Sequence, residues 1–141
     1  MNTFRPKYFA LQELVGPEFF QKWGERSWEW LRPELLQTID QIREKFGSVT
    51  INNWHVGGVF KESGLRDFIT STGAGNSLHK YGCAMDCKFQ GVKPAEVQSY
   101  ILSRPEMFPL LTCMEDAEIT KTWLHVDVRN HGQAGVWIVK P

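Results

Sequence analysis

The alternation of apolar and polar side chains in residues 122–128 restricts the fold of this chain most. In an extended segment, every second side chain points to the same side. One side holds Leu124, Val126 and Val128, and the other side holds Trp123, His125 and Asp127. This pattern predicts a strand with one buried face, whose opposite face carries an imidazole and a carboxylate at fixed positions.

A second stretch, residues 77–86, contains an imidazole and a carboxylate seven residues apart, at His79 and Asp86. Gly82 lies between them and permits a sharp bend, and a strand-like run, residues 84–89, follows. We predict that His79, Asp86 and His125 bind one Zn²⁺ and leave a fourth position open, which is the arrangement of a catalytic zinc site. Two neutral imidazoles and one carboxylate leave a charge of about +1 on such a centre, so the ion stays a strong Lewis acid.

Length and composition argue against several classes of protein. A chain of 141 residues fits one domain, residues 1–141, with enough buried surface to need no disulfide. The three cysteines form no paired C-x-x-C motif, and Cys83 and Cys87 are interpreted as small buried residues near Asp86. Sixteen basic residues balance sixteen acidic ones, so nucleic acid is not expected as a partner. No apolar run approaches the length of a membrane span.

The order of elements predicts an α+β fold, with helices packed against a small, mostly antiparallel sheet. Short helices are expected in residues 8–23, and the clearest helix begins at Pro33 and ends at Gly47. A further helix opens at Pro94 and stops before Pro105. Strands are expected at residues 49–54, 84–89, 108–115, 123–128 and 135–139, with residues 116–121 connecting the third strand to the fourth.

The two polar stretches resemble a known family. The pattern Ser77-x-His79-x-x-Gly82-x-Ala84-x-Asp86, followed by Trp123-x-His125, is similar to the zinc-ligand signature of the D-alanyl-D-alanine carboxypeptidases and dipeptidases. That family includes the L-alanyl-D-glutamate endopeptidases of bacteriophage lysins, and its metal fold is shared with the hedgehog signalling domain. The resemblance covers essentially the whole chain. It implies a zinc-dependent hydrolase of D-amino-acid-containing peptide bonds in peptidoglycan.

The resemblance also bears on the catalytic residues. In such enzymes an arginine upstream of the first ligand steadies the transition state or the substrate, and Arg66 matches that position; the other interpretation of Arg66 is an ordinary surface salt bridge. Many members carry an acid three residues before the last histidine ligand, where this chain has Thr122. A threonine hydroxyl is not a base at neutral pH.

The general base therefore has to come from elsewhere. Hairpin geometry puts Glu115 first, because it can share a face with His125 across a strand pair. Asp127 is predicted to orient an imidazole. Asp116 and Glu118 remain alternatives, and all four acids could also lie in a solvated turn. No function is assigned to His55, and His131 is either a substrate contact or a loop residue without function.

The function that the resemblance implies is hydrolysis of the peptidoglycan stem peptide with one zinc ion, by a protein of phage or prophage origin; a monomer is expected. Residues 1–7 lack the apolar segment of a signal peptide. Synthesis in the cytoplasm is therefore expected, with action on the cell wall after lysis-type release or on a virion. Two alternatives stay open: a non-catalytic, zinc-stabilised module that binds cell wall or a virion protein, and an intracellular amidase or dipeptidase.

Overall fold

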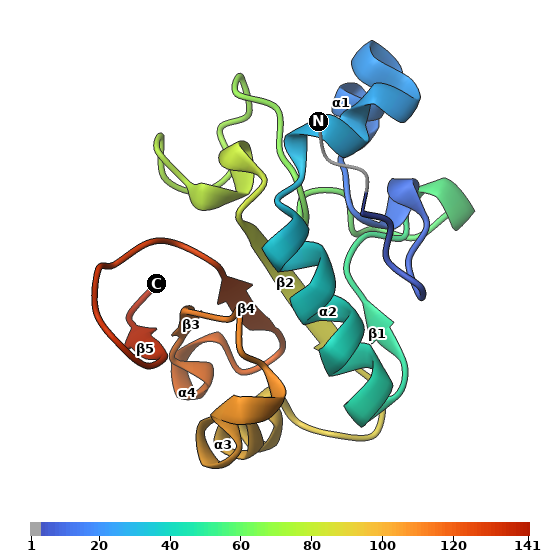
Figure 1. The fold of residues 1–141 in the computed structure, drawn as a ribbon. Coiled ribbons are helices and arrows are strands. Elements are labelled where there is room, and N and C mark those ends of the chain that lie inside the picture. Colours follow the sequence, from blue (N-terminus) through green and yellow to red (C-terminus); the bar gives the residue numbers. More distant parts are fainter. Residues whose placement is uncertain (1–3) are drawn as a thin grey trace.

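The structure, a computed structural model, describes residues 4–141 and confirms the expected α+β class (Figure 1). Within these residues, four helices pack with a five-stranded mixed sheet of order β1-β2-β4-β3-β5. The strands are β1 (Val49–Thr50), β2 (Ala84–Phe89), β3 (Cys113–Glu115), β4 (Leu124–Asp127) and β5 (Trp137–Val139). The α-helices are α1 (Pro17–Trp23), α2 (Pro33–Phe46), α3 (Pro94–Ser103) and α4 (Ala117–Thr120).

Five short 3₁₀ helices connect these elements: η1 (Leu11–Glu13), η2 (Gly24–Trp30), η3 (Trp54–Val56), η4 (Leu78–Tyr81) and η5 (Pro105–Met107). The expected short helices in residues 8–23 are η1 and α1. Residues 1–3, which belong to the segment 1–7 where no signal peptide is expected, lie outside the described residues. Among residues 4–141, no helix combines the length and apolar character needed to cross a bilayer.

Helix α2 begins at Pro33 and ends before Gly47, as the sequence predicts. Pro33 occupies its first position, where the missing N–H costs no intrahelical bond, and Gly47 ends it with φ 83°, which a glycine adopts without strain. Its apolar face is buried in the main core, through Leu35, Leu36, Ile39 and Ile42. Helix α2 lies over β2 and is in contact with it (Figure 1).

The two faces of the sheet differ in chemistry. Met85 and Cys87 of β2 and Leu124 and Val126 of β4 belong to the core that also contains α2 and α3 residues. Because side chains alternate along a strand, the positions between them point to the opposite face. Asp86 and His125 lie on that face, so the fold buries one side of the sheet and leaves the other for polar chemistry.

Two predicted strands are wrong in extent. The strand expected at residues 49–54 ends at Thr50, because the buried side chain of Asn52 binds two other segments of the chain. Its amide donates to the carbonyl of Val15, and its side-chain oxygen accepts from the N–H of Ser63. The strand expected at residues 108–115 begins only at Cys113. Pro109, which has no N–H, precedes it in a turn.

The connections around β3 also differ in detail from the prediction. The antiparallel pairing of β3 with β4 is confirmed, but the connection between them contains α4, capped by the side chain of Asp116. The closing strand β5 pairs with β3 in parallel, while the other three strand pairs are antiparallel. The sheet is therefore mixed, with antiparallel pairs in the majority.

Candidate metal centre

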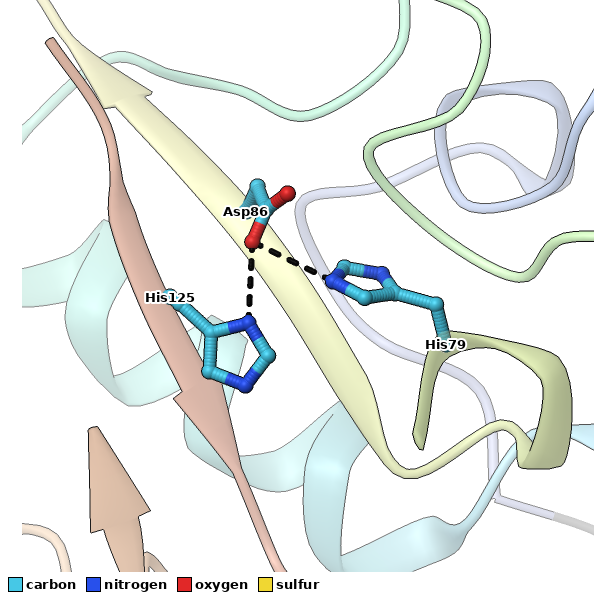
Figure 2. A group of neighbouring side chains, drawn as sticks. All are labelled: His79, Asp86 and His125. Carbon is cyan, nitrogen blue, oxygen red and sulfur yellow. Dashed lines mark hydrogen bonds and ion pairs between the residues drawn. The ribbon is translucent and has the colours of Figure 1, made fainter. Parts of the chain in front are cut away.

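Three side chains from distant parts of the chain converge on one point (Figure 2). His79 Nε2 lies 3.2 Å from Asp86 Oδ1, and His125 Nδ1 lies 3.1 Å from the same oxygen. These three atoms all lie within 4.8 Å of one another. Ligand atoms about 2.0–2.1 Å from a tetrahedral zinc ion are separated from one another by about 3.3 Å, so the spacing suits a shared metal ion.

The backbone accounts for this convergence. Asp86 of β2 and His125 of β4 are directly paired in the antiparallel register, which brings their side chains together on one face. His79 comes from η4, and Gly82 turns the chain from η4 into β2 with φ 68°. A Cβ at Gly82 would lie 1.8 Å from the carbonyl oxygen of Trp30, so only glycine fits this bend.

The outer nitrogen of each imidazole is held by a hydrogen-bond acceptor. His79 Nδ1 lies 3.0 Å from the carbonyl oxygen of Gly64, and His125 Nε2 lies 2.9 Å from Asp127 Oδ2. An acceptor at that position fixes the proton on the outer nitrogen, which leaves a lone pair on the inner one. Two imidazole lone pairs and a carboxylate oxygen then face each other, an arrangement that a bound cation stabilises.

The electrostatics of Asp86 and His125 agree with a site for positive charge. Burial disfavours the charged form of Asp86, but hydrogen bonds from His125 and His79 outweigh it, and the pKa of this carboxyl lies far below its ordinary value. Burial also disfavours a charged His125, yet its hydrogen bonds to Asp127 and Asp86 raise the pKa of this imidazole to about 9. The site therefore attracts positive charge, and its His₂Asp ligand set suits zinc.

Arg66 is buried beside the three ligands and is not in a surface salt bridge. Its Nε donates to the carbonyl oxygen of Glu62 at 2.6 Å, and its two terminal nitrogens lie 3.5 Å from Ser77 Oγ and 3.4 Å from Asp86 Oδ2. The guanidinium thus lies against the ligand carboxylate, on the side of Oδ2. From there it can donate to a group that binds next to Asp86.

Glu115 lies where the hairpin argument predicted. Within β3, Glu115 follows Met114, which is paired with Val126 of β4, and Glu115 Oε1 is 3.7 Å from His125 Nδ1. Its side chain is partly exposed and lines the cavity above the ligands. The two alternatives point elsewhere: Asp116 caps α4, and Glu118 is exposed on that helix.

Asp127 cannot meet a substrate directly, because its side chain is fully buried. One of its oxygens accepts from His125, and both accept from the guanidinium of Arg129, at 2.8 Å from Nε and 2.6 Å from Nη2. Burial opposes ionisation of this acid, but Arg129 and His125 hold its pKa below the ordinary value. This geometry supports the predicted orienting role of Asp127.

Two cavities meet at the ligands and share Arg66, Asp86 and Trp123 as lining residues. One, of about 510 Å³, is lined on its outer part by Val59, Phe60, Lys61 and Thr122. The other, of about 380 Å³, contains His79, His125, Glu115 and Arg129. The two cavities are therefore neighbours at Asp86.

Three contributors to this region were not predicted from the sequence: the carbonyl of Gly64, Arg129 and Lys88. Gly64 approaches the backbone of Leu14 so closely that a Cβ would lie 2.2 Å from its carbonyl oxygen. Lys88 Nζ donates to Ile51 O, Ser63 Oγ and Asp86 O, and burial lowers its pKa to about 8. Only Arg129 carried a usable signal, since a basic side chain two residues after Asp127 can pair with that acid, as it does here.

The remaining candidates lie apart from the ligands. His131 is held by the backbone, with Nε2 3.0 Å from the carbonyl of Thr112 and its ring stacked on Trp137 at 4.2 Å. His55 is exposed in η3. Cys87 is buried as expected, whereas Cys83 is only half-buried; the three cysteines are free thiols.

Comparison of the chain with protein-family models, with curated protein sequences and with solved structures finds no match.

Proposed function

We propose that this protein is a zinc-dependent peptidase that hydrolyses D-amino-acid-containing bonds of the peptidoglycan stem peptide. The observation that carries the proposal is the convergence of His79, Asp86 and His125 beside two cavities that meet at Asp86. Structural zinc sites are closed by four protein ligands, whereas catalytic sites keep a position open. Within residues 4–141, the group that could hold a metal has three members.

Bound zinc would supply Lewis acidity, which polarises a carbonyl and acidifies water. Glu115 is the proposed general base: Oε1 takes a proton from the attacking water and returns it to the leaving amine. Its reach is supported by the 3.7 Å distance to His125 Nδ1 and by its partial exposure to the cavity. Arg66 donates to the developing oxyanion, a role that suits a buried guanidinium next to Asp86.

The substrate class comes from the resemblance described above, as does a hedgehog-like arrangement of the metal fold. We also propose a phage or prophage origin and a monomer, with access to the cell wall after lysis-type release or on a virion. The two cavities that share Asp86 as a lining residue, of about 510 and 380 Å³, are large enough for a peptide.

A second candidate function is favoured by Thr122, which stands where many members of the resembled family carry an acid. In that alternative the protein binds zinc for stability and attaches to cell wall or to a virion protein without hydrolysis. Thr122 lines the larger cavity and offers no carboxylate there. Glu115 is the residue that distinguishes the two candidates, since it supplies a carboxylate from the neighbouring strand.

The test is incubation of the purified protein with peptidoglycan sacculi and with defined muropeptides, followed by mass spectrometry of the products. Peptide-bond cleavage that a chelator suppresses and added zinc restores supports the peptidase. Tight binding to sacculi without any cleavage supports the non-catalytic module. Cleavage of free dipeptides but not of sacculi would assign the protein to small-molecule amidases or dipeptidases.

A further inference from the structure

Lys88 has hydrogen bonds to three different segments beside the candidate metal centre. Its Nζ donates to Ser63 Oγ at 2.7 Å, to the carbonyl of Ile51 at 2.6 Å and to the carbonyl of Asp86 at 3.3 Å. A lysine ammonium has three N–H donors and no acceptor. All three donors are therefore engaged within the protein, and Lys88 offers neither a free donor to a substrate nor a lone pair to a proton.

Lys88 and Asp86 lie on the same face of β2, because residues i and i+2 of a strand share a face. Ser63 lies beside this part of the strand. Its carbonyl accepts from the N–H of Asp86 at 2.7 Å, and its hydroxyl accepts from the ammonium of Lys88. Ser63 is thus bound to the strand of the metal ligand through both its backbone and its side chain.

The residues that follow Ser63 contact the metal-ligand side chains. The carbonyl oxygen of Gly64 lies 3.0 Å from Nδ1 of His79, and Nη2 of Arg66 lies 3.4 Å from the ligand carboxylate. The backbone N–H of Arg66 also donates to the carbonyl of His79 at 3.1 Å. A shift of Ser63 would therefore move the acceptor that orients His79, which is only one residue further along the chain.

Space filling does not account for a lysine at position 88. Its positive charge is held by two carbonyls, a hydroxyl and the aromatic ring of Phe60, whose centroid lies 4.2 Å from Nζ. A half-buried cation with such partners costs solvation free energy that an apolar side chain of the same length would not. A link between three segments, by contrast, needs the three donors of the ammonium.

We propose that Lys88 is a positioning residue of the zinc site, which fixes Ser63 against β2 and thereby holds the Gly64 carbonyl on the imidazole of His79. The inference rests on the proposed function and adds a residue that sets zinc affinity without contacting the ion. Loss of a hydrogen-bond partner of a metal ligand costs about 10- to 100-fold in metal affinity. Because Lys88 acts on such a partner through Ser63, we expect an effect at the lower end, about 10-fold.

The experiment measures the zinc dissociation constant by competition with a chromophoric chelator, for the wild type, Lys88→Met, Ser63→Ala and the double variant. Methionine is unbranched like lysine and has no N–H donor. Lys45→Met is the matched control, because Lys45 Nζ also lies over an aromatic ring, 4.7 Å from the centroid of Tyr100, but lines neither cavity at the ligands. Urea unfolding of the metal-free proteins is measured in parallel.

We expect Lys88→Met to weaken zinc binding about 10-fold, Ser63→Ala to act in the same direction, and the double variant to add little to Lys88→Met. Lys45→Met should bind zinc as the wild type does. A wild-type dissociation constant in Lys88→Met, even with lower stability to urea, would overturn the proposal, as would full additivity of the two changes. Should Lys88→Met not fold, weaker zinc binding by Ser63→Ala supports the link and unchanged binding overturns it.

Failure of the proposed function would be seen separately. A wild type that binds zinc but does not cleave peptidoglycan contradicts the peptidase, and the affinities still decide the role of Lys88. If the wild type binds no zinc, hydrogen exchange of the metal-free protein decides it. Lys88→Met should then speed exchange at the N–H groups of Asp86 and Arg66, and not at Val126 of β4. Exchange rates equal to those of the wild type at Asp86 and Arg66 would overturn the proposal.

Discussion

Asp86 and His125 face each other directly across the antiparallel strands β2 and β4, and Asp86 Oδ1 lies 3.1 Å from His125 Nδ1. This pair forms a rigid half of the candidate metal centre, since β4 lies between β2 and β3 and the N–H of Asp86 donates to the carbonyl of Ser63 at 2.7 Å. His79 completes the centre from η4, outside the sheet. The metal would therefore join the sheet to the segment that precedes β2, and its removal should affect stability as well as activity.

The first prediction concerns the effect of zinc binding on thermal stability. Zinc added to the metal-free protein is expected to raise Tm, because a ligand that binds only the folded state stabilises it by mass action. His79→Ala is expected to abolish the zinc-dependent rise, whereas His55→Ala, at an exposed histidine in η3, should keep it. Differential scanning fluorimetry measures Tm with and without zinc for each variant, and metal analysis measures the bound zinc. An equal rise in His79→Ala and wild type would exclude His79 as a ligand.

The second prediction separates catalysis from metal binding. Glu115→Gln is expected to lower kcat by about 10²- to 10⁴-fold, because the amide cannot accept the proton of the attacking water. Zinc stoichiometry should stay that of the wild type, since Glu115 is 3.7 Å from His125 Nδ1 and is not one of the three ligand side chains. Glu118→Gln is the matched control on α4. Turnover at the wild-type rate in Glu115→Gln would remove this residue from the mechanism.

The third prediction tests the bend at Gly82, which positions His79. Gly82→Ala combines a positive φ of 68° with a Cβ placed 1.8 Å from Trp30 O, whereas Gly91→Ala has a φ of 80° and open space around its Cβ. The backbone term alone costs about 1–2 kcal/mol. Urea unfolding should therefore show a loss within that range for Gly91→Ala and a larger loss for Gly82→Ala. Equal losses would mean that the chain around Trp30 moves away without cost.

The fourth prediction concerns pH and the loop beside the site. The backbone N–H of Ile69, and then Lys22, lowers the pKa of Asp67 below its ordinary value of 3.8, against the effect of burial. A carboxyl with a lower pKa in the folded state stabilises the protein above the unfolded-state pKa and loses this effect as the pH falls through the folded-state pKa. Asp67→Asn should therefore lower Tm at pH 6.

That difference in Tm should shrink as the pH falls below 3.8. Thermal unfolding of the wild type, of Asp67→Asn and of the exposed control Glu106→Gln across this range measures it. A difference that stays constant down to pH 2 would show that the charge of Asp67 is not the cause, since the carboxyl is protonated there in the unfolded state.

Features that depend on neighbours along the chain could be predicted from the amino-acid sequence. Helix α2 follows from its apolar spacing between Pro33 and Gly47, and strand alternation placed His125 and Asp127 on one face opposite the core. The ligand types at positions 79, 86 and 125 were also readable, because imidazole and carboxylate groups beside a glycine bend are a local pattern. These signals act within a few residues, where backbone geometry leaves few alternatives.

Contacts between distant segments could not be predicted in this way and are known from the folded chain alone. The early end of β1 follows from the buried Asn52, which binds Val15 and Ser63, and the parallel pairing of β5 depends on the path of the whole C-terminal segment. The Gly64 carbonyl reaches His79 because residues 64–65 pack against Leu14. Nothing in local spacing encodes such pairings: their free energy depends on which surfaces the complete fold brings together, and so the partners that orient the metal ligands emerge only when the chain is folded.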